Sequence, residues 1–177
     1  MKYLIQLAVT AILESMNPIE LCNYRPTDAA AIDAIGVAAF AQYSDAYDDW
    51  PQFKDKIATM SSLAAHGEIV IAHRGSEVLG AVAYVGPHQV KSDFFNPAWP
   101  IMRMLVVAPG ARGLGVGRLL ALECIARARR DHAEVFALHT STLMSVALAM
   151  YQRMGFEWHA PAPTIHGVAY GIYLKKL

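Results

Sequence analysis

The sequence predicts an α/β (α+β) fold in which about four helices flank a mixed, mostly antiparallel sheet of about seven strands. Strand-like and helix-like hydrophobic patterns alternate along the chain from Pro18 onward. Two strand patterns, EIVIAHR and VLGAVAYVG, are joined by the turn sequence RGSE and therefore indicate an antiparallel hairpin. Of the 177 residues, 55% are hydrophobic and 17% are charged, which provides enough apolar surface for the core of a single domain.

The first elements follow from the N-terminal pattern. IELCNYR is a strand pattern that ends at Pro26, and Thr27 or Asp28 can cap the helix that follows. The small and apolar residues of this helix share one face at helical spacing: Ile32, Ile35, Gly36, Ala39 and Phe40. The aromatic and acidic segment AQYSDAYDDWP is predicted to be a loop, and a second helix is expected through FKDKIATMSSLAAH.

After the hairpin, a strand is predicted from about Trp99 to Val107 and a helix from about Gly115 to Arg130. The helix carries arginines in its last turn, where cations oppose the negative end of the helix dipole. EVFALHT is the next strand, and TLMSVALAMYQRM is a helix that ends at Gly155. The strands FEWHA and GVAYGIYLKKL complete the pattern, with the Pro-rich segment 161–163 predicted as a loop between them.

The first fifteen residues match a secretory signal peptide poorly. They contain one basic residue, Gln6 interrupts the apolar run, and no Ala-x-Ala cleavage site follows. The run is also too short to span a bilayer. We therefore expect residues 1–17 to be an extension, either an appended helix or the product of an upstream start codon with Met16 as the true start. Residues 18–177 are expected to form one domain.

Charge and cysteine content narrow the classes of partner. The 15 Lys and Arg residues balance the 15 Asp and Glu residues, so no overall field attracts nucleic acid or an anionic membrane, and a small partner is expected. Cys22 and Cys124 form no CxxC or Cys/His pattern, so no metal is expected. Both cysteines are predicted to be buried apolar residues in a reducing compartment, which indicates a cytoplasmic protein.

The stretch ARGLGVGRLL lies between the strand that ends at Val107 and the helix that follows it. A helix start leaves backbone N–H groups without partners, and glycines let an anion approach them closely. Arg112 and Arg118 flank the stretch and can add charge-assisted hydrogen bonds. The segment is therefore a candidate site for phosphate or pyrophosphate.

Two common nucleotide-binding motifs do not fit this stretch. A P-loop requires Lys followed by Ser or Thr after its last glycine, whereas Gly117 is followed by Arg118 and Leu119. A dinucleotide fingerprint that starts at Gly113 requires Gly or Ala at the sixth position, which is Arg118 here. A nucleotide-binding oxidoreductase is therefore disfavoured.

Two motifs give the chain a resemblance to a known family. RGLGVG, residues 112–117, fits the pattern Arg/Gln-x-x-Gly-x-Gly/Ala of the GNAT superfamily of acyl-CoA-dependent N-acyltransferases. Downstream, ALAMYQRMGFEW is similar to the segment A-x-x-L-Y-x-K/R-x-G-F that closes the acyl-CoA site in that family. The order of predicted elements from about Ile19 to Leu174 also fits. The resemblance implies an acyltransferase domain over 18–177, acetyl-CoA as co-substrate, and a sheet splayed in the middle where the strand ending MLVV diverges from EVFALHT.

The resemblance also implies roles for individual residues. Val107 N–H is a candidate oxyanion donor, and Tyr151 is the candidate acid that protonates the departing sulfur. Many relatives carry Asn seven residues before this tyrosine, where this chain has Met144. Thr140 or Ser141 then makes that contact, or the contact is absent. The expected coenzyme-binding residues are Leu105, Val106, Val107, Arg112, Gly113, Leu114, Gly115, Val116, Gly117, Arg118, Thr140 and Ser141.

The acceptor side is less defined by sequence. The loop between the first two helices, with Tyr43, Tyr47 and Trp50, is expected to line the acceptor pocket together with the segment before the last strand. Aromatic walls beside acidic groups suit a cationic amine, and they suit an aromatic substrate too. Strand alternation places Arg103 on the face opposite Met102 and Met104, where it contacts an acidic acceptor or pairs with a carboxylate. Candidates for the general base are Asp45, Asp48, Asp49, Glu68 and His139.

The predicted function is an N-acetyltransferase that moves acetyl from acetyl-CoA to a primary amine of a small molecule or peptide, by direct attack in a ternary complex. Antibiotic, polyamine, amino acid and protein N-terminus all stay open as acceptors, and the resemblance is compatible with a homodimer. Neither cysteine lies in a nucleophile motif. The alternative is a non-catalytic acyl-CoA-binding or sensing domain, which keeps the glycine-rich stretch but does not need Tyr151.

Overall fold

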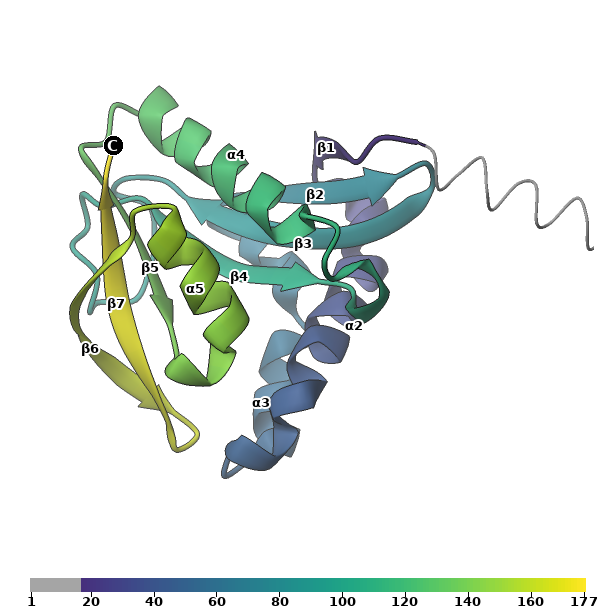
Figure 1. Cartoon of the computed structure of the whole chain (residues 1–177), viewed down its shortest axis with the longest axis horizontal. Helices are drawn as coiled ribbons and strands as arrows, with labels where there is room; N and C mark the ends of the chain where they lie inside the picture. The colour runs from purple at the N-terminus through teal and green to yellow at the C-terminus, as the bar shows by residue number, and fades with distance from the viewer. Residues whose placement is uncertain (1–16) are drawn as a thin grey trace, which may run out of the picture.

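The computed structural model describes residues 17–177, and the predicted extension lies outside the described residues except for its last residue. A single sheet runs through the molecule in the strand order β1-β2-β3-β4-β5-β7-β6 (Figure 1). All neighbouring strands are antiparallel except the parallel pair β4 and β5, which confirms the mixed, mostly antiparallel sheet. The strands are β1 Glu20–Asn23, β2 Glu68–Arg74, β3 Glu77–Val85, β4 Ile101–Val107, β5 Val135–Thr140, β6 Glu157–Ile165 and β7 Val168–Lys176.

Helices cover both faces of the sheet. Val116, Leu120 and Cys124 of α4 pack with side chains of β2 and β3 on one face, and α5 joins the same apolar cluster. Ile32 of α2 packs on the opposite face with Ala81 of β3. The α-helices are α2 Ala29–Phe40, α3 Trp50–Ile57, α4 Val116–Arg130 and α5 Ser145–Arg153, and the short 3-10 turns are η1 Pro26–Asp28, η2 Ala41–Ala46, η3 Met60–Ala65, η4 Pro109–Ala111 and η5 Thr142–Met144. None of the helices within residues 17–177 has the length and apolar character needed to cross a membrane.

A β-bulge interrupts the pairing of β3 with β4. Arg103 pairs with Ala83 and Val106 pairs with Ala81, so β4 has one residue more than its partner between these two pairs. Met104, inside the bulge, has a left-handed backbone with φ 51. A bulge bends its strand and increases the local twist, and this one follows directly after Met102, the last residue of β4 that pairs with β5.

Three details of the predicted elements are wrong. The second helix ends at Ile57, and a separate 3-10 turn, η3, follows it. Pro161 and Pro163 lie within the continuous strand β6 rather than in a loop. Proline cannot donate a ladder hydrogen bond, but β6 is the last strand of the sheet and has a free edge that tolerates it. Cys22 is half-buried, whereas Cys124 is fully buried as expected.

An ion-pair network fastens the C-terminal end of α4 to the start of β2. Arg127 reaches Glu68 at 2.7 Å and Glu123 at 3.0 Å, and Arg130 reaches Glu68 at 2.6 Å. Arg130 also holds Asp131 at 2.8 Å. The hydrogen bonds from Arg130 lower the pKa of the carboxyl groups of both Glu68 and Asp131. The network therefore depends on both carboxylates being ionised.

We expect this network to make stability fall in acid. A carboxyl group whose folded pKa is lowered adds stability above its unfolded pKa, and that contribution disappears as the pH falls below about 4. The midpoint of thermal unfolding should drop between neutral pH and about pH 3, and this drop should be smaller in Glu68→Gln than in the wild type. Glu77→Gln, an exposed change at the first residue of β3, is the matched control. Equal acid sensitivity of the wild type and Glu68→Gln would contradict this assignment.

Candidate functional site

The strands β4 and β5 are joined over only a short distance. Their parallel register contains two pairs, Ile101 with Ala137 and Met102 with Leu138, and beyond these the strands run apart (Figure 1). Ala108 donates its N–H to Leu79 of β3 at 2.8 Å, so by strand alternation the preceding amide, that of Val107, points to the other edge of β4. The sheet therefore opens into a gap whose β4 edge presents the Val107 N–H.

The glycine-rich segment forms the start of α4 beside this gap. Gly115 is the N-cap of α4 with φ 81, and Gly113 has φ 79, both left-handed values that side chains rarely adopt. The first helical hydrogen bond runs from the Leu119 N–H to the Gly115 carbonyl, at 3.0 Å. Three backbone N–H groups therefore point out of the helix start without a helical partner, those of Val116, Gly117 and Arg118. The helix dipole favours an anion at this end.

Gly117 lies at the narrow point between α4, β4 and α5. A Cβ atom on Gly117 would lie 3.5 Å from Leu105 Cδ2, 3.6 Å from Val107 Cγ2 and 3.8 Å from Met150 Sδ. The absence of a side chain at this position keeps the space between the two helices and β4 open.

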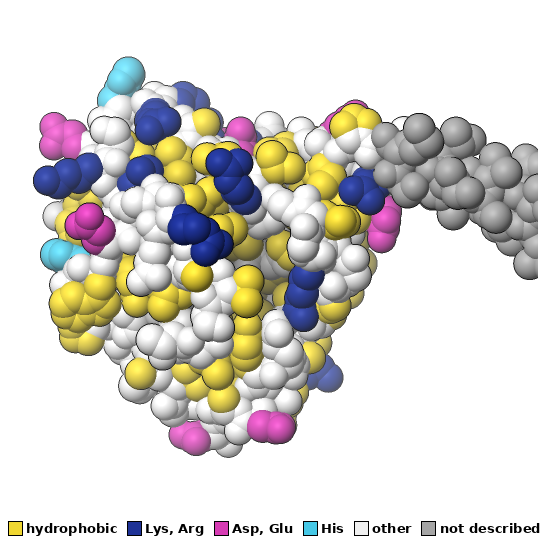
Figure 2. Space-filling view, in the orientation of Figure 1, with side chains coloured by type: hydrophobic (Ala, Val, Ile, Leu, Met, Phe, Trp, Pro, Cys, Tyr) yellow, Lys and Arg dark blue, Asp and Glu magenta, His cyan; other side chains and the backbone are white. Residues whose placement is uncertain are grey.

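The two arginines that flank the glycine-rich segment are placed differently. Arg118 is exposed on the first turn of α4. Arg112 turns its guanidinium toward the end of α2, donating to the Ala39 carbonyl at 3.2 Å and to Gln42 at 3.4 Å. Lys and Arg side chains stand out in the middle of this face, while Asp and Glu lie toward its margins (Figure 2). The Arg112 N–H also donates within the protein, to the Pro109 carbonyl at 3.4 Å, so Arg118 is the arginine whose side chain is left exposed beside the glycine-rich segment.

Of the other predicted coenzyme residues, Gly113, Leu114 and Gly115 are exposed in the loop and Val116 is buried under it. Val106 pairs with Ala81 and its side chain packs on the α2 face, so it is turned away from the gap. Thr140 and Ser141 are buried at the end of β5. The Ser141 hydroxyl already accepts the Leu143 N–H at 3.2 Å, and the Thr140 hydroxyl lies 3.8 Å from Met144 Sδ.

Tyr151 projects from α5 into the cluster shared with α4. Its ring lies edge-on to Phe156 at 5.9 Å, and the side chain is only 6% exposed. Burial raises the pKa of its hydroxyl, and the neighbouring Cys124 adds to the increase. No side-chain hydrogen bond from the described residues contributes to this shift. The hydroxyl is therefore a protonated group that is available to donate.

A wall of packed aromatic side chains lies on the other face of the sheet. Tyr47 and Tyr170 of β7 share a hydrogen bond between their hydroxyls at 2.7 Å, and Tyr47 stacks on Phe53 at 4.2 Å. Trp50 and Tyr43 pack around this pair, half-buried. The loop is fixed to the β6–β7 turn because the Asp48 N–H donates to the His166 carbonyl at 2.9 Å. The predicted acceptor aromatics thus meet the last hairpin, and Tyr170 joins them from a strand that no sequence motif marked.

Arg103 and His139 lie where the strands begin to part. They follow the last β4–β5 pair, and both face away from α4, since Arg103 is paired with Ala83 of the α2-side cluster. The His139 ring is surrounded by Phe94, Phe95 and Tyr170 at 5.5 to 5.7 Å. Burial and then the charge of Arg103 lower the pKa of His139 to about 4.

The predicted alternation around Arg103 is half wrong. Met102 lies in the α4-side cluster, opposite Arg103 as expected, but Met104 packs on the α2 side with it. The bulge at Met104 adds one residue to β4 and so shifts the alternation by one position.

The five candidates for the general base differ in their position relative to the gap between β4 and β5. Glu68, at the start of β2, is bound to two arginines, and β3 separates it from the β4 edge that borders the gap. Asp49 caps α3 by accepting the Gln52 N–H at 3.0 Å, Asp48 rests on Gly167, and Asp45 is exposed. His139 alone of the five lies at the gap. Within residues 17–177, no cluster of three or more His, Cys, Asp and Glu side chains suits a metal ion.

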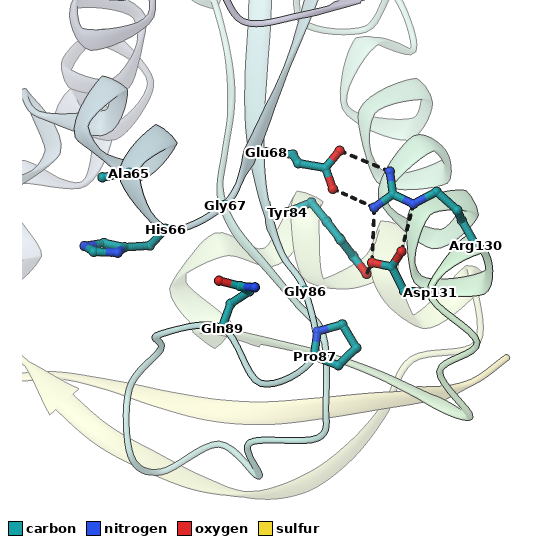
Figure 3. A pocket seen from close by; sticks show the side chains of 10 residues that line it. All are labelled: Ala65, His66, Gly67, Glu68, Tyr84, Gly86, Pro87, Gln89, Arg130 and Asp131. Atoms are coloured by element: carbon teal, nitrogen blue, oxygen red, sulfur yellow. Dashed lines mark hydrogen bonds and ion pairs between the residues drawn. The ribbon is translucent and has the colours of Figure 1, made fainter.

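A separate cavity lies away from this gap. It has a volume of about 570 Å³ and lies between the start of β2, the end of β3 and the C-terminal end of α4 (Figure 3). Its charged residues Glu68, Arg130 and Asp131 are bound to one another, and Tyr84 donates to Asp131 at 2.7 Å. No sequence motif pointed to this cavity, and its charged groups are paired with one another.

Comparisons with known proteins agree with this geometry. The acetyltransferase (GNAT) family profile matches residues 38–156. A curated relative, N-acetyltransferase 8F1 of Rattus norvegicus, is 32% identical over 99 residues, which are 56% of this chain and 43% of that protein, so the match spans less than half of the relative.

Solved structures share the fold along most of its length. A GCN5-related N-acetyltransferase from Rhodopseudomonas palustris, also described as a class-II aminotransferase, has 25% identity and a TM-score of 0.68, covering 92% of this chain and 98% of its own. The acetyltransferase yncA of Salmonella typhimurium, solved with its cofactor acetyl-CoA, has 18% identity and a TM-score of 0.64, covering 90% and 94%. Because the family profile spans more than half of the sequence, the chain belongs to the GNAT family of acetyltransferases.

Proposed function

We propose that this protein is an acetyl-CoA-dependent N-acetyltransferase that acts on a primary amine by direct attack in a ternary complex. The observation that carries the proposal is the gap between β4 and β5, with the open N-terminus of α4 at its head. A donor that reaches the gap from the α4 side and an acceptor that reaches it from the α2 side meet without crossing the sheet. The solved relative that contains acetyl-CoA supports the identity of the donor.

The residues present fit the coenzyme. The free amides at the start of α4 and the exposed Arg118 suit a pyrophosphate, and Gly117 leaves room for the pantetheine arm. Leu105 and Val107 border that path. The coenzyme supplies the acetyl thioester, and this chain supplies the environment in which an amine displaces the thiol.

Two groups of the chain assist the displacement in this proposal. The Val107 N–H points into the gap and can donate to the carbonyl oxygen as it gains charge. The Tyr151 hydroxyl, held protonated by burial, can give its proton to the departing sulfur. The amine becomes an amide and loses one proton, and the thiolate gains one. His139, at the gap, is the best-placed acceptor of the amine proton, although a pKa of about 4 makes it a weak base before substrate binds.

A covalent route through cysteine has little support. Burial raises the pKa of the Cys124 thiol, so the reactive thiolate is suppressed. Cys22 lies in β1, at the far edge of the sheet from β4 and β5. The second candidate, a non-catalytic acyl-CoA-binding domain, keeps the coenzyme site and has no use for the buried tyrosine hydroxyl.

The test is a screen of primary amines with acetyl-CoA, in which released thiol reports turnover and mass spectrometry identifies a product heavier by one acetyl group. Calorimetry with acetyl-CoA and with NAD supplies the binding control. We expect acetyl-CoA to bind and at least one amine to be acetylated. Binding without acetylation of any amine would favour the sensing domain, and binding of NAD alone would overturn the proposal.

A further inference from the structure

One cation on the acceptor side of the sheet lacks a protein partner. Arg103 is half-buried, and among residues 17–177 no carboxylate oxygen lies within ion-pair distance of its guanidinium. Burial lowers the pKa of this group, and neither a charge nor a hydrogen bond from the described residues offsets the effect. Partly buried charges are normally paired, because an isolated charge loses much of its hydration.

The position of Arg103 connects it to the reaction. It is the first residue of β4 after the last pair with β5, so it lies at the point where the gap begins. It is close enough to His139 for its charge to lower the pKa of that ring. The aromatic wall of Tyr47 and Tyr170 and the ring of Phe94 lie on the same face around His139.

The acidic residues of the acceptor loop do not neutralise this cation. Asp49 is engaged as the cap of α3, Asp48 rests on Gly167 in the β6–β7 turn, and Asp45 accepts a hydrogen bond from Ser44 at 3.2 Å. The charge next to the reacting centre on this face is therefore positive. Such a site disfavours a polyamine, which carries several positive charges, and favours an amine that also carries an anion.

We propose that the acceptor is an amine that carries a carboxylate, an amino acid or a close relative, and that Arg103 binds this carboxylate. The inference rests on the proposed function and names its substrate class. Guanidinium and carboxylate are planar and can form two parallel hydrogen bonds, which fixes the direction of the acceptor as well as its charge. With the carboxylate on Arg103, the amine is directed toward the gap, and the aromatic wall contacts the remainder of the molecule.

The first test uses the wild-type protein and pairs of amines that differ only in charge. The probes are L-phenylalanine against L-phenylalaninamide, L-methionine against L-methioninamide, and 4-aminobutanoate against 4-aminobutanamide. Acetyl-CoA turnover is measured for each member. We expect kcat/KM for the acid to exceed that for the amide by about 10- to 100-fold in at least one pair, as a charge-assisted hydrogen bond predicts.

The second test changes the arginine. In Arg103→Gln the ratio of acid to amide should fall to about one, and in Arg103→Lys it should be intermediate, because lysine keeps the charge but not the planar fork. Arg129→Gln, an exposed change on α4, is the matched control and should keep the wild-type ratio. Removal of an unpaired, half-buried charge should leave the thermal midpoint of Arg103→Gln unchanged or higher, which separates a binding role from a structural one.

The outcomes are distinct from those of the proposed function. Acetylation of amides as fast as acids, or an acid preference that survives in Arg103→Gln, would overturn this inference and leave acetyl transfer intact. If no probe is acetylated and none raises the thermal midpoint of the protein saturated with coenzyme A, the inference is likewise overturned. Failure to bind acetyl-CoA would instead overturn the proposed function.

Discussion

Tyr151→Phe is expected to lower kcat by about 100-fold or more, with little change in the affinity for acetyl-CoA. The change removes one hydroxyl and leaves the ring in place against Phe156. The departing sulfur then lacks its proton donor, and the loss should appear in kcat because the hydroxyl acts as the thiol leaves. Initial rates under saturating acetyl-CoA measure kcat, and calorimetry measures coenzyme binding.

The control and the pH profile sharpen this test. Tyr173→Phe removes a buried hydroxyl from the same apolar cluster and should keep most of the activity. Because burial raises the pKa of Tyr151 above 10.0, the wild type should keep its acid at every pH up to that value. Unchanged turnover in Tyr151→Phe would remove the residue from the mechanism. If kcat instead fell as the pH rose just above neutral, another group would be the proton donor.

Gly117→Val is expected to raise the Kd for acetyl-CoA by about 100-fold, and Gly117→Ala by about 10-fold. A side chain at this position would extend into the space bordered by Leu105, Val107 and Met150, which the pantetheine arm needs. The protein without ligand tolerates the alanine, because every neighbour of its Cβ is at 3.5 Å or more. Calorimetry with acetyl-CoA measures the affinity of each variant.

Stability should move in the opposite direction in the alanine variant. Gly117 lies in the first turn of a helix, where alanine is favoured over glycine by up to about 1 kcal/mol. A thermal midpoint equal to or above wild type, together with weaker coenzyme binding, would identify a blocked site rather than a damaged fold. Gly110→Ala, in the same connection and with open space around its Cβ, is the control. Wild-type affinity in Gly117→Val would contradict the proposed path of the coenzyme.

The sequence predicted the sheet and the start of α4 well because both depend on local signals. Alternating apolar residues, the turn at Gly75 and the glycines before Val116 each act over a few positions. The prolines of β6 were misread because their tolerance depends on the strand being at the edge, which is a property of the whole sheet. The secondary-structure propensity of a residue does not tell whether its strand lies at the edge or in the middle of the sheet.

The two sides of the candidate site also differ in how far local sequence predicts them. The proposed coenzyme side follows from a motif, because backbone amides at a helix start need only glycine and spacing. The acceptor side does not, because Tyr170 joins Tyr47 from 123 positions away and the partner of Arg103 cannot be inferred from its neighbours. A single inserted residue at Met104 was enough to reverse the expected face of a side chain. Arg112 likewise turned to the end of α2, which its motif did not indicate.

The short pairing between β4 and β5 also has a consequence for the resistance of the protein to proteolysis. Within residues 17–177, two residue pairs make up the strand pairing between β1 to β4 and β5 to β7, although the apolar cluster under α4 also spans both halves. Local opening along such a line costs less than global unfolding, and proteases act on the opened form. A donor bound across the gap would contact both halves at once, so we expect its binding to make this opening less frequent.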